Sequence, residues 1–205
     1  MLHPSTWLIT VFLLTCGPVL AQTDFELEEE SDGVTVYVRP EANGELSVRV
    51  ETTVATDVAG VKAVLDDAGH YVDWVHRCDG AYIVEGGQPD DYVFVSGIDM
   101  PFPFRDKEIV ARVVQYDKSD GTMVRSIVGE PGAVAPTSGR DRPGVYVGEW
   151  VVRPLTDRQV HVQVTVRTDA GNGVPMWLRK EIITSGPAKT VGNLRRLLEQ
   201  RAAAK

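Results

Sequence analysis

Most of the chain alternates apolar and polar residues, and this period of two is typical of half-buried β-strands. The clearest case is the segment 159–167, where Val160, Val162, Val164 and Val166 alternate with polar residues. The same criterion predicts strands over residues 34–38, 46–54, 81–85, 92–98, 107–116, 122–128, 145–152 and 160–167. Because one face of these strands is polar, we expect an antiparallel sheet with one face in water.

A helical period replaces the alternation in two places. Asp57 is expected to cap a helix over residues 58–67, and a short helix or turn follows at 70–75. Residues 176–201 repeat apolar positions at helical spacing. Pro187 lies inside this last segment and should kink or split it, because proline removes a backbone hydrogen bond and clashes with the preceding turn.

The order of these elements predicts an α+β fold. Two strands, one or two short helices, about six further strands and a long C-terminal helix follow one another along the chain. A strongly twisted antiparallel sheet can curl around such a helix. We therefore expect a curved antiparallel sheet wrapped around the C-terminal helix, with an internal hydrophobic cavity between them.

The N-terminal segment reads as a targeting sequence. An apolar run at 7–14 is broken at Gly17, and small residues before position 22 predict cleavage after Ala21. Residues 1–21 are thus predicted to be a signal peptide and 22–205 a single domain, exported to the periplasm or secreted. An uncleaved membrane anchor and lipidation at Cys16 remain as alternatives.

The net charge of the sequence limits the classes of binding partner. The 29 Asp and Glu residues exceed the 21 Lys and Arg residues, for a formal net charge of −8. An acidic surface repels phosphate backbones, so no nucleic acid is expected as a partner. Steady docking on an anionic membrane is disfavoured for the same reason, which leaves at most transient membrane contact.

Residues that carry chemistry are sparse. The sequence contains neither a Gly-x-Ser-x-Gly nucleophile motif nor a phosphate-binding loop. His70 and His76 lack the spacing of a metal site, and a zinc pair of His76 with Cys78 lacks the further ligands that a structural site needs nearby. Cys78 is the one cysteine beyond position 21, so no disulfide is expected within that part. We predict no catalytic residue, no metal site and no cofactor.

Three stretches resemble a known family. They are "VYVRPEANGELSVRVETTV" followed by "YVDWV", then "MPFPFRDKEIVARV", then "TDAGNGVPMWLRKEIITSGPAKTVGNLRRLLE". In this order they resemble the START domains, the lipid transfer domains related to the steroidogenic acute regulatory protein, over roughly residues 30–200. The resemblance implies a helix-grip fold that encloses one apolar molecule between sheet and terminal helix.

The resemblance implies that the proline-rich corner before residue 107 lies at the entry to a central strand. Pro101 and Pro103 would end one strand and fix the backbone, so that Phe102 and Phe104 point toward the core or the cavity wall. The following Arg105-Asp106 pair would bond backbone groups left open by the corner. A structural clamp is therefore predicted, and a catalytic Arg-Asp pair is the alternative.

The resemblance also selects candidate residues for a lipid-binding cavity. They are Trp74, Tyr92, Phe94, Phe102, Arg112, Tyr146, Trp150, Met176 and Trp177. Each aromatic residue taken alone is better explained as ordinary core, but that explanation is weaker for the set. Arg112 is included because the family often buries an arginine on this strand, although an exposed pair with Glu108 is the simpler interpretation. The long loop 129–144 is either a lid near the cavity mouth or a mobile surface loop.

These features predict non-catalytic binding or transport of a hydrophobic small molecule, most simply a lipid. One alternative is an enzyme of the cyclase or hydrolase type, because helix-grip relatives include such enzymes. It would require an ionisable residue with a shifted pKa in the cavity. Another alternative is a ligand-free structural module with a filled core.

Overall fold

The computed structural model describes residues 24–41, 45–169 and 174–203. Its strands are β1 Glu26–Ser31, β2 Val34–Pro40, β3 Leu46–Val54, β4 Cys78–Ile83, β5 Asp91–Ile98, β6 Lys107–Asp117, β7 Met123–Gly129, β8 Tyr146–Thr156 and β9 Gln159–Thr168. Its helices are α1 Val58–Leu65, the 3₁₀ turn η1 Ala68–Asp73, α2 Met176–Lys180, the π-helical segment η2 Glu181–Ser185 and α3 Gly186–Ala203. The predicted strands are all present, and β1 is an additional one.

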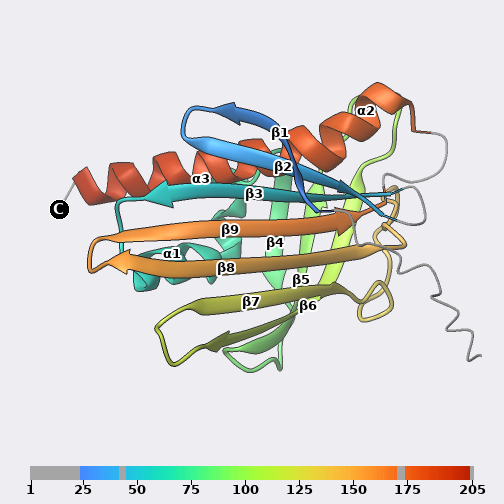
Figure 1. Cartoon of the computed structure of the whole chain (residues 1–205). Coiled ribbons are helices and arrows are strands. Elements are labelled where there is room, and N and C mark those ends of the chain that lie inside the picture. Colours follow the sequence, from blue (N-terminus) through green and yellow to red (C-terminus); the bar gives the residue numbers. More distant parts are fainter. Residues whose placement is uncertain (1–23, 42–44, 170–173, 204–205) are drawn as a thin grey trace, which may run out of the picture.

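The strands form one antiparallel sheet in the order β1-β2-β3-β9-β8-β7-β6-β5-β4. The connection through α1 and η1 carries the chain from β3 to β4 at the opposite edge of the sheet. The sheet curls, so that β4 and β5 run steeply behind β8 and β9, and α3 lies along the β2–β3 end (Figure 1). The predicted fold class, a curved sheet around a long C-terminal helix, is confirmed.

The core follows from the alternation in the strands. Val48 and Val50 of β3 face Val166 and Val164 of β9 across the sheet. On α3 the buried residues are Val191, Leu194 and Leu198, at the spacing of one helix face. This face packs on the valine-rich side of the sheet, which fixes the helix against β3 and β2.

The helix boundaries have local causes. The Asp57 side chain accepts a hydrogen bond from the backbone N–H of Gly60 at 2.7 Å, which caps α1 as predicted. The predicted interruption at Pro187 takes the form of the π-helical segment Glu181–Ser185, in which the Gly186 N–H donates to the Glu181 carbonyl. Because Pro187 has no N–H to donate, the wider turn accommodates it without ending the helix.

The corner between β5 and β6 is a clamp, but not with the predicted orientation of both aromatics. Asp106 Oδ1 accepts from the Met100 N–H at 2.9 Å, and the Phe104 N–H donates to the Pro101 carbonyl at 3.0 Å. Phe104 packs against the core, whereas Phe102 is 96 % exposed. The prediction for Phe102 is wrong, because the tight turn between the two prolines leaves this residue at its outer apex.

Several predictions fall on residues outside the described ranges. They are the signal peptide at 1–21, cleavage after Ala21 and lipidation at Cys16. Within the described residues, no helix is long and apolar enough to cross a membrane.

Candidate ligand cavity

A cavity of about 200 Å³ lies between the sheet and the C-terminal helix. Strands β5 to β9 supply one wall, and the segment after η1 together with α2, η2 and the start of α3 supplies the other. The apolar lining residues include Leu65, Trp74, Phe94, Ile98, Ile109, Val113, Ile127, Trp150, Val164, Val166, Leu178, Ile182 and Val191. The sequence had predicted such a cavity from the order of its elements.

Strand register explains why this space stays open. Gly148 of β8 lies between Ile127 of β7 and Val166 of β9 on the inner face of the sheet. Its missing side chain leaves room where a larger residue would fill the centre of the sheet. A Cβ at this position would meet only ordinary contacts, the nearest being Ile127 Cβ at 3.6 Å.

Aromatic rings form the inner end of the cavity. The rings of Trp74 and Trp150 meet edge to face with centroids 6.2 Å apart, and Tyr71 meets Trp74 at 5.2 Å. Such edge contacts fix ring orientation as well as burying apolar area. Among the described residues, Trp74 Nε1 is buried without a hydrogen-bond partner. The inner end is therefore walled by packed aromatic rings and is mostly apolar.

Trp74, Phe94, Tyr146 and Trp150 of the predicted set line the cavity. Tyr92 is buried at 7 % exposure but does not line it. The prediction for Tyr92 is wrong, because its side chain packs in the hydrophobic core instead of facing the cavity. The same burial raises the pKa of its hydroxyl.

Arg112 does not reach the cavity either. Its guanidinium donates to both carboxylate oxygens of Asp91, each at 2.7 Å, on the outer surface. The predicted pair with Glu108 is also wrong. Glu108 lies on the same side of β6, but the loop 129–144 covers it there and leaves Arg112 in solvent.

On α2 the cavity is lined by the neighbour of the predicted residue Trp177. Trp177 is 63 % exposed, while Leu178 and Ile182, one turn apart, line the cavity. Adjacent helix residues point about 100° apart, so Trp177 turns outward when Leu178 turns inward. Met176 begins α2, and its side chain lies outside the described part of the structure.

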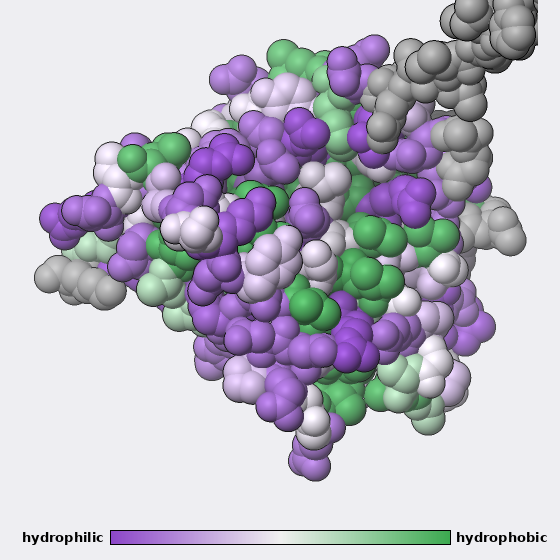
Figure 2. Space-filling model, turned by 60° about the horizontal axis from the view of Figure 1, so that its bottom comes forward, coloured by the Kyte–Doolittle hydropathy of each residue, from purple (hydrophilic) through white to green (hydrophobic). Residues whose placement is uncertain are grey.

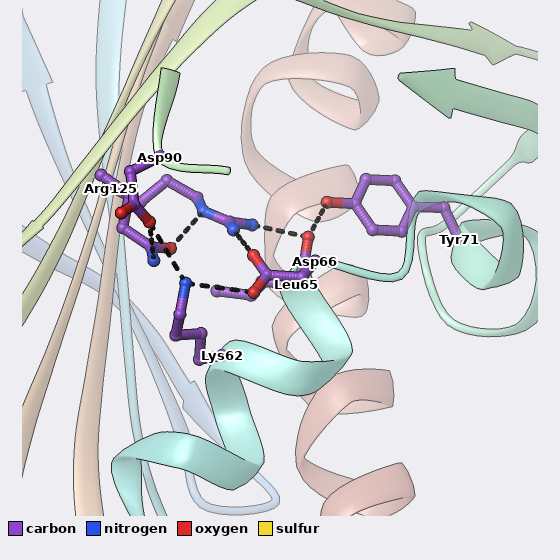
Figure 3. A network of polar contacts seen from close by, with 7 residues as sticks. Lys62, Leu65, Asp66, Tyr71, Asp90 and Arg125 are labelled. Carbon is purple, nitrogen blue, oxygen red and sulfur yellow. Dashed lines mark hydrogen bonds and ion pairs between the residues drawn. The ribbon is translucent and has the colours of Figure 1, made fainter. Parts of the chain in front are cut away.

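Arg125 is the buried charge at the inner end, and it was not predicted. Its Nη1 donates to the Leu65 carbonyl at 2.6 Å and its Nε to Gln115 Oε1 at 3.0 Å, while Nη2 pairs with Asp66. Tyr71 donates to the same Leu65 carbonyl (Figure 3). Arg125 lies between Met123 and Ile127 at a spacing of two residues on β7, so the three side chains share one face. This period could have predicted that Arg125 faces inward.

The opposite end of the cavity is polar and opens outward. Lys107, Thr168 and Asp169 line both the cavity and a wider groove of about 1130 Å³. The groove continues over the loop 129–144, β1, the β2–β3 ends and α2. These three residues therefore mark the mouth of the cavity.

A third polar cluster lies in the wall beside the helix. His76 Nε2 is 3.4 Å from Glu181 Oε1, and Lys189 Nζ is 2.6 Å from the same oxygen. Burial and then the Lys189 charge lower the pKa of His76. The hydrogen bond from Lys189 lowers the pKa of Glu181, so this pair consists of a neutral imidazole and a carboxylate near pH 7.

The loop 129–144 is fastened to the sheet by buried charges. Arg142 Nε donates to Glu108 Oε2 at 2.7 Å, and Arg142 also donates to the carbonyls of Pro131, Val134 and Ala135. Glu108 is only 4 % exposed. The loop is thus held at the mouth by specific bonds, which argues against a mobile surface loop.

Sequence comparisons find a relative of this chain but no family model. No family model matches the sequence. An uncharacterized protein of Pseudomonas aeruginosa is 29% identical over 186 residues, which are 90% of this chain and 91% of the relative.

Solved structures give the fold a name. A STAR-related lipid transfer protein from Xanthomonas axonopodis has a TM-score of 0.77 at 22% identity, covering 85% of this chain and 98% of that one. Human StAR-related lipid transfer protein 5 has a TM-score of 0.77 at 18% identity, covering 89% of each chain. An aromatase/cyclase from Streptomyces is more distant, with a TM-score of 0.55 at 18% identity over 76% of this chain and 94% of that one. The chain has the helix-grip fold of the START domains.

Proposed function

We propose that this protein binds one hydrophobic small molecule, a lipid, in the internal cavity and carries it without changing it. The observation that carries the proposal is an enclosed apolar space walled by Trp74, Phe94 and Trp150 inside an otherwise complete fold. Concave apolar sites with few polar groups are what hydrophobic ligands require. The names of the START-fold neighbours, which are lipid transfer proteins, support the same reading.

The dimensions limit what the enclosed part can hold. Its volume of about 200 Å³ is smaller than the roughly 300–1,000 Å³ of typical ligand pockets. A single ring or a short length of chain fits there. The remainder of a larger lipid would extend through the mouth at Lys107 and Thr168 into the outer groove.

Loading requires the mouth to open, and we place this motion in the loop 129–144 or at the helix interruption near Gly186 and Pro187.

We further propose that the protein works after export and touches membranes only transiently. Phe102 and Trp177, both strongly exposed, project from the corner and the helix whose neighbouring residues line the cavity. In the view of Figure 2 the surface is largely hydrophilic, and its apolar residues form small separate patches.

A second candidate function is catalysis on a molecule in the same cavity. The His76–Glu181 pair in the wall favours it, because a neutral imidazole beside a carboxylate can act as a base. The Streptomyces neighbour shows that this fold also occurs in an aromatase/cyclase. A change in the mass of an extracted ligand after incubation with fresh protein would favour this function over carriage.

The first test is native mass spectrometry of protein purified from its own host, followed by organic extraction. A lipid-like mass at one copy per chain is expected. Gly148→Leu should fill the cavity and abolish this adduct, while Gly148→Ala, which the site accommodates, should retain it. An adduct that survives in Gly148→Leu at full occupancy would show that the ligand lies elsewhere.

A further inference from the structure

The polar groups that line the cavity differ in whether their hydrogen bonds are already made. At the inner end, the Arg125 guanidinium is occupied by Leu65, Gln115 and Asp66. A ligand head group placed there would have to displace bonds within the protein. The Arg125 charge is therefore not available to a ligand head group, and the Trp74 donor at this end, unpaired among the described residues, is neutral.

At the mouth, by contrast, a charged donor has no partner in the described part of the chain. Lys107 begins β6 and shares the inner face of that strand with Ile109 and Val113, so its side chain leans over the cavity. Among the residues that the structure describes, its ammonium group has no ion-pair or hydrogen-bond partner. The nearby Asp169 carboxylate accepts from the Val145 N–H at 2.8 Å and makes no ion pair with Lys107.

A second, neutral donor lies inside the cavity rather than at the mouth. Tyr146 begins β8, pairs with Thr168 of β9 and lines the cavity. Within the described part of the chain, its hydroxyl makes no hydrogen bond. Burial raises the pKa of Tyr146 to about 12, so the hydroxyl keeps its proton and can donate it.

We propose that the ligand is an anionic amphiphile, which binds tail first with its acidic head at the mouth, against the ammonium group of Lys107. This ammonium group lacks an acceptor among the described residues, and a carboxylate or phosphate head supplies acceptor oxygens with the matching charge. This inference rests on the proposed function and adds the class and direction of the ligand.

The test compares ligands with one tail and different heads on the purified protein. Dodecanoate, dodecyl phosphate, dodecanol and dodecyltrimethylammonium are titrated by calorimetry and followed by the fluorescence of Trp74 and Trp150. Both anions should bind roughly 10- to 100-fold more tightly than dodecanol, the range expected for a charge-assisted hydrogen bond. Inorganic phosphate without a tail should give no measurable heat.

Variants assign the preference to the mouth. Lys107→Met should reduce the ratio of dodecanoate to dodecanol affinity by tenfold or more, and Lys107→Arg should largely restore it. Lys118→Met, at the far end of the same β6 hairpin, should leave the ratio unchanged.

The outcomes separate the two proposals. Equal binding of anion and alcohol, with Lys107→Met unchanged, would overturn the head-group assignment and leave lipid binding standing. Tighter binding of the cationic amphiphile would overturn it as well. If no amphiphile binds and the protein carries none from its host, the proposed function fails and this inference fails with it.

Discussion

Replacing Glu108 by Gln tests whether buried charge holds the loop 129–144 over the mouth. In the structure, Arg142 donates to Glu108 Oε2 through Nε at 2.7 Å, and Thr137 contacts the other carboxylate oxygen. The two charged side chains are 5 % and 11 % exposed, so solvent screens them little. Gln would remove the negative charge and leave the buried guanidinium without a counterion.

The expected cost follows from that arrangement. Removing one partner of a buried ion pair typically destabilises a protein by about 3–5 kcal/mol. Arg142 keeps its bonds to the Val134 and Ala135 carbonyls, so we expect the lower end, about 3 kcal/mol. For a domain of this size the midpoint of thermal unfolding should fall by roughly 6–12 °C.

Acid provides an internal check on the same pair. Burial opposes ionisation of Glu108, but hydrogen bonds from Thr137 and Arg142 outweigh it and lower the pKa below its usual value. A carboxyl with a lowered pKa stabilises the folded state above the unfolded value, about 4.3 for Glu. This stabilisation is lost as pH falls through the folded pKa. The difference between wild type and Glu108→Gln should therefore be full at pH 7 and shrink below about pH 4.

Circular dichroism melts at several pH values measure these shifts, and limited proteolysis within the loop reports local opening. Asp91→Asn is the matched control, because it breaks the exposed Arg112–Asp91 pair on the neighbouring β5. It should barely change the melting midpoint, since exposed pairs contribute little. Equal effects of the two variants, or a loop no more readily cleaved in Glu108→Gln, would refute the reasoning.

Three further perturbations probe other parts of the molecule. Arg125→Met should lower the unfolding free energy by about 3 kcal/mol in urea titrations, because Gln115 Oε1 and the Asp66 carboxylate lose the guanidinium that donates to them; a loss below 1 kcal/mol would argue against the network of Figure 3. His76 has a lowered pKa, so the unfolded state binds its proton first as pH falls below about 6.5 and wild type should lose stability there. His76→Gln should flatten that slope, and an unchanged slope would contradict the assignment. Phe102→Ser combined with Trp177→Ser should leave the melting midpoint unchanged but slow ligand exchange with lipid vesicles; unchanged exchange would exclude these aromatics from membrane contact.

Local pattern was enough to predict most of the fold. Val160 to Val166 showed their strand directly, because one face of β9 is buried and the other is wet. β1 was missed since all six of its residues are exposed and its sequence ELEEES contains no alternation. A strand that only closes the edge of a sheet leaves no hydrophobic signature.

The site was harder to predict because it depends on rotation and on covering segments. Trp177 and Leu178 are neighbours in sequence, and only the phase of α2 decides which one meets the cavity. Glu108 and Arg112 lie on one side of β6, and only the loop 129–144 separates a buried charge from a solvated one. The inward place of Lys107 follows from strand parity, but its free ammonium group is visible only in three dimensions.

The missed strand β1 has a consequence for how copies of this protein coexist. A sheet edge presents unpaired backbone N–H and C=O groups, and an unprotected edge can recruit a strand from another molecule. β1 lies at such an edge, and four of its residues are glutamates. One of them, Glu28, is tied to Lys180 of α2 at 2.8 Å, and the others leave the rim strongly negative. Two such rims repel each other, so the acidic run disfavours pairing of two copies through their β1 edges.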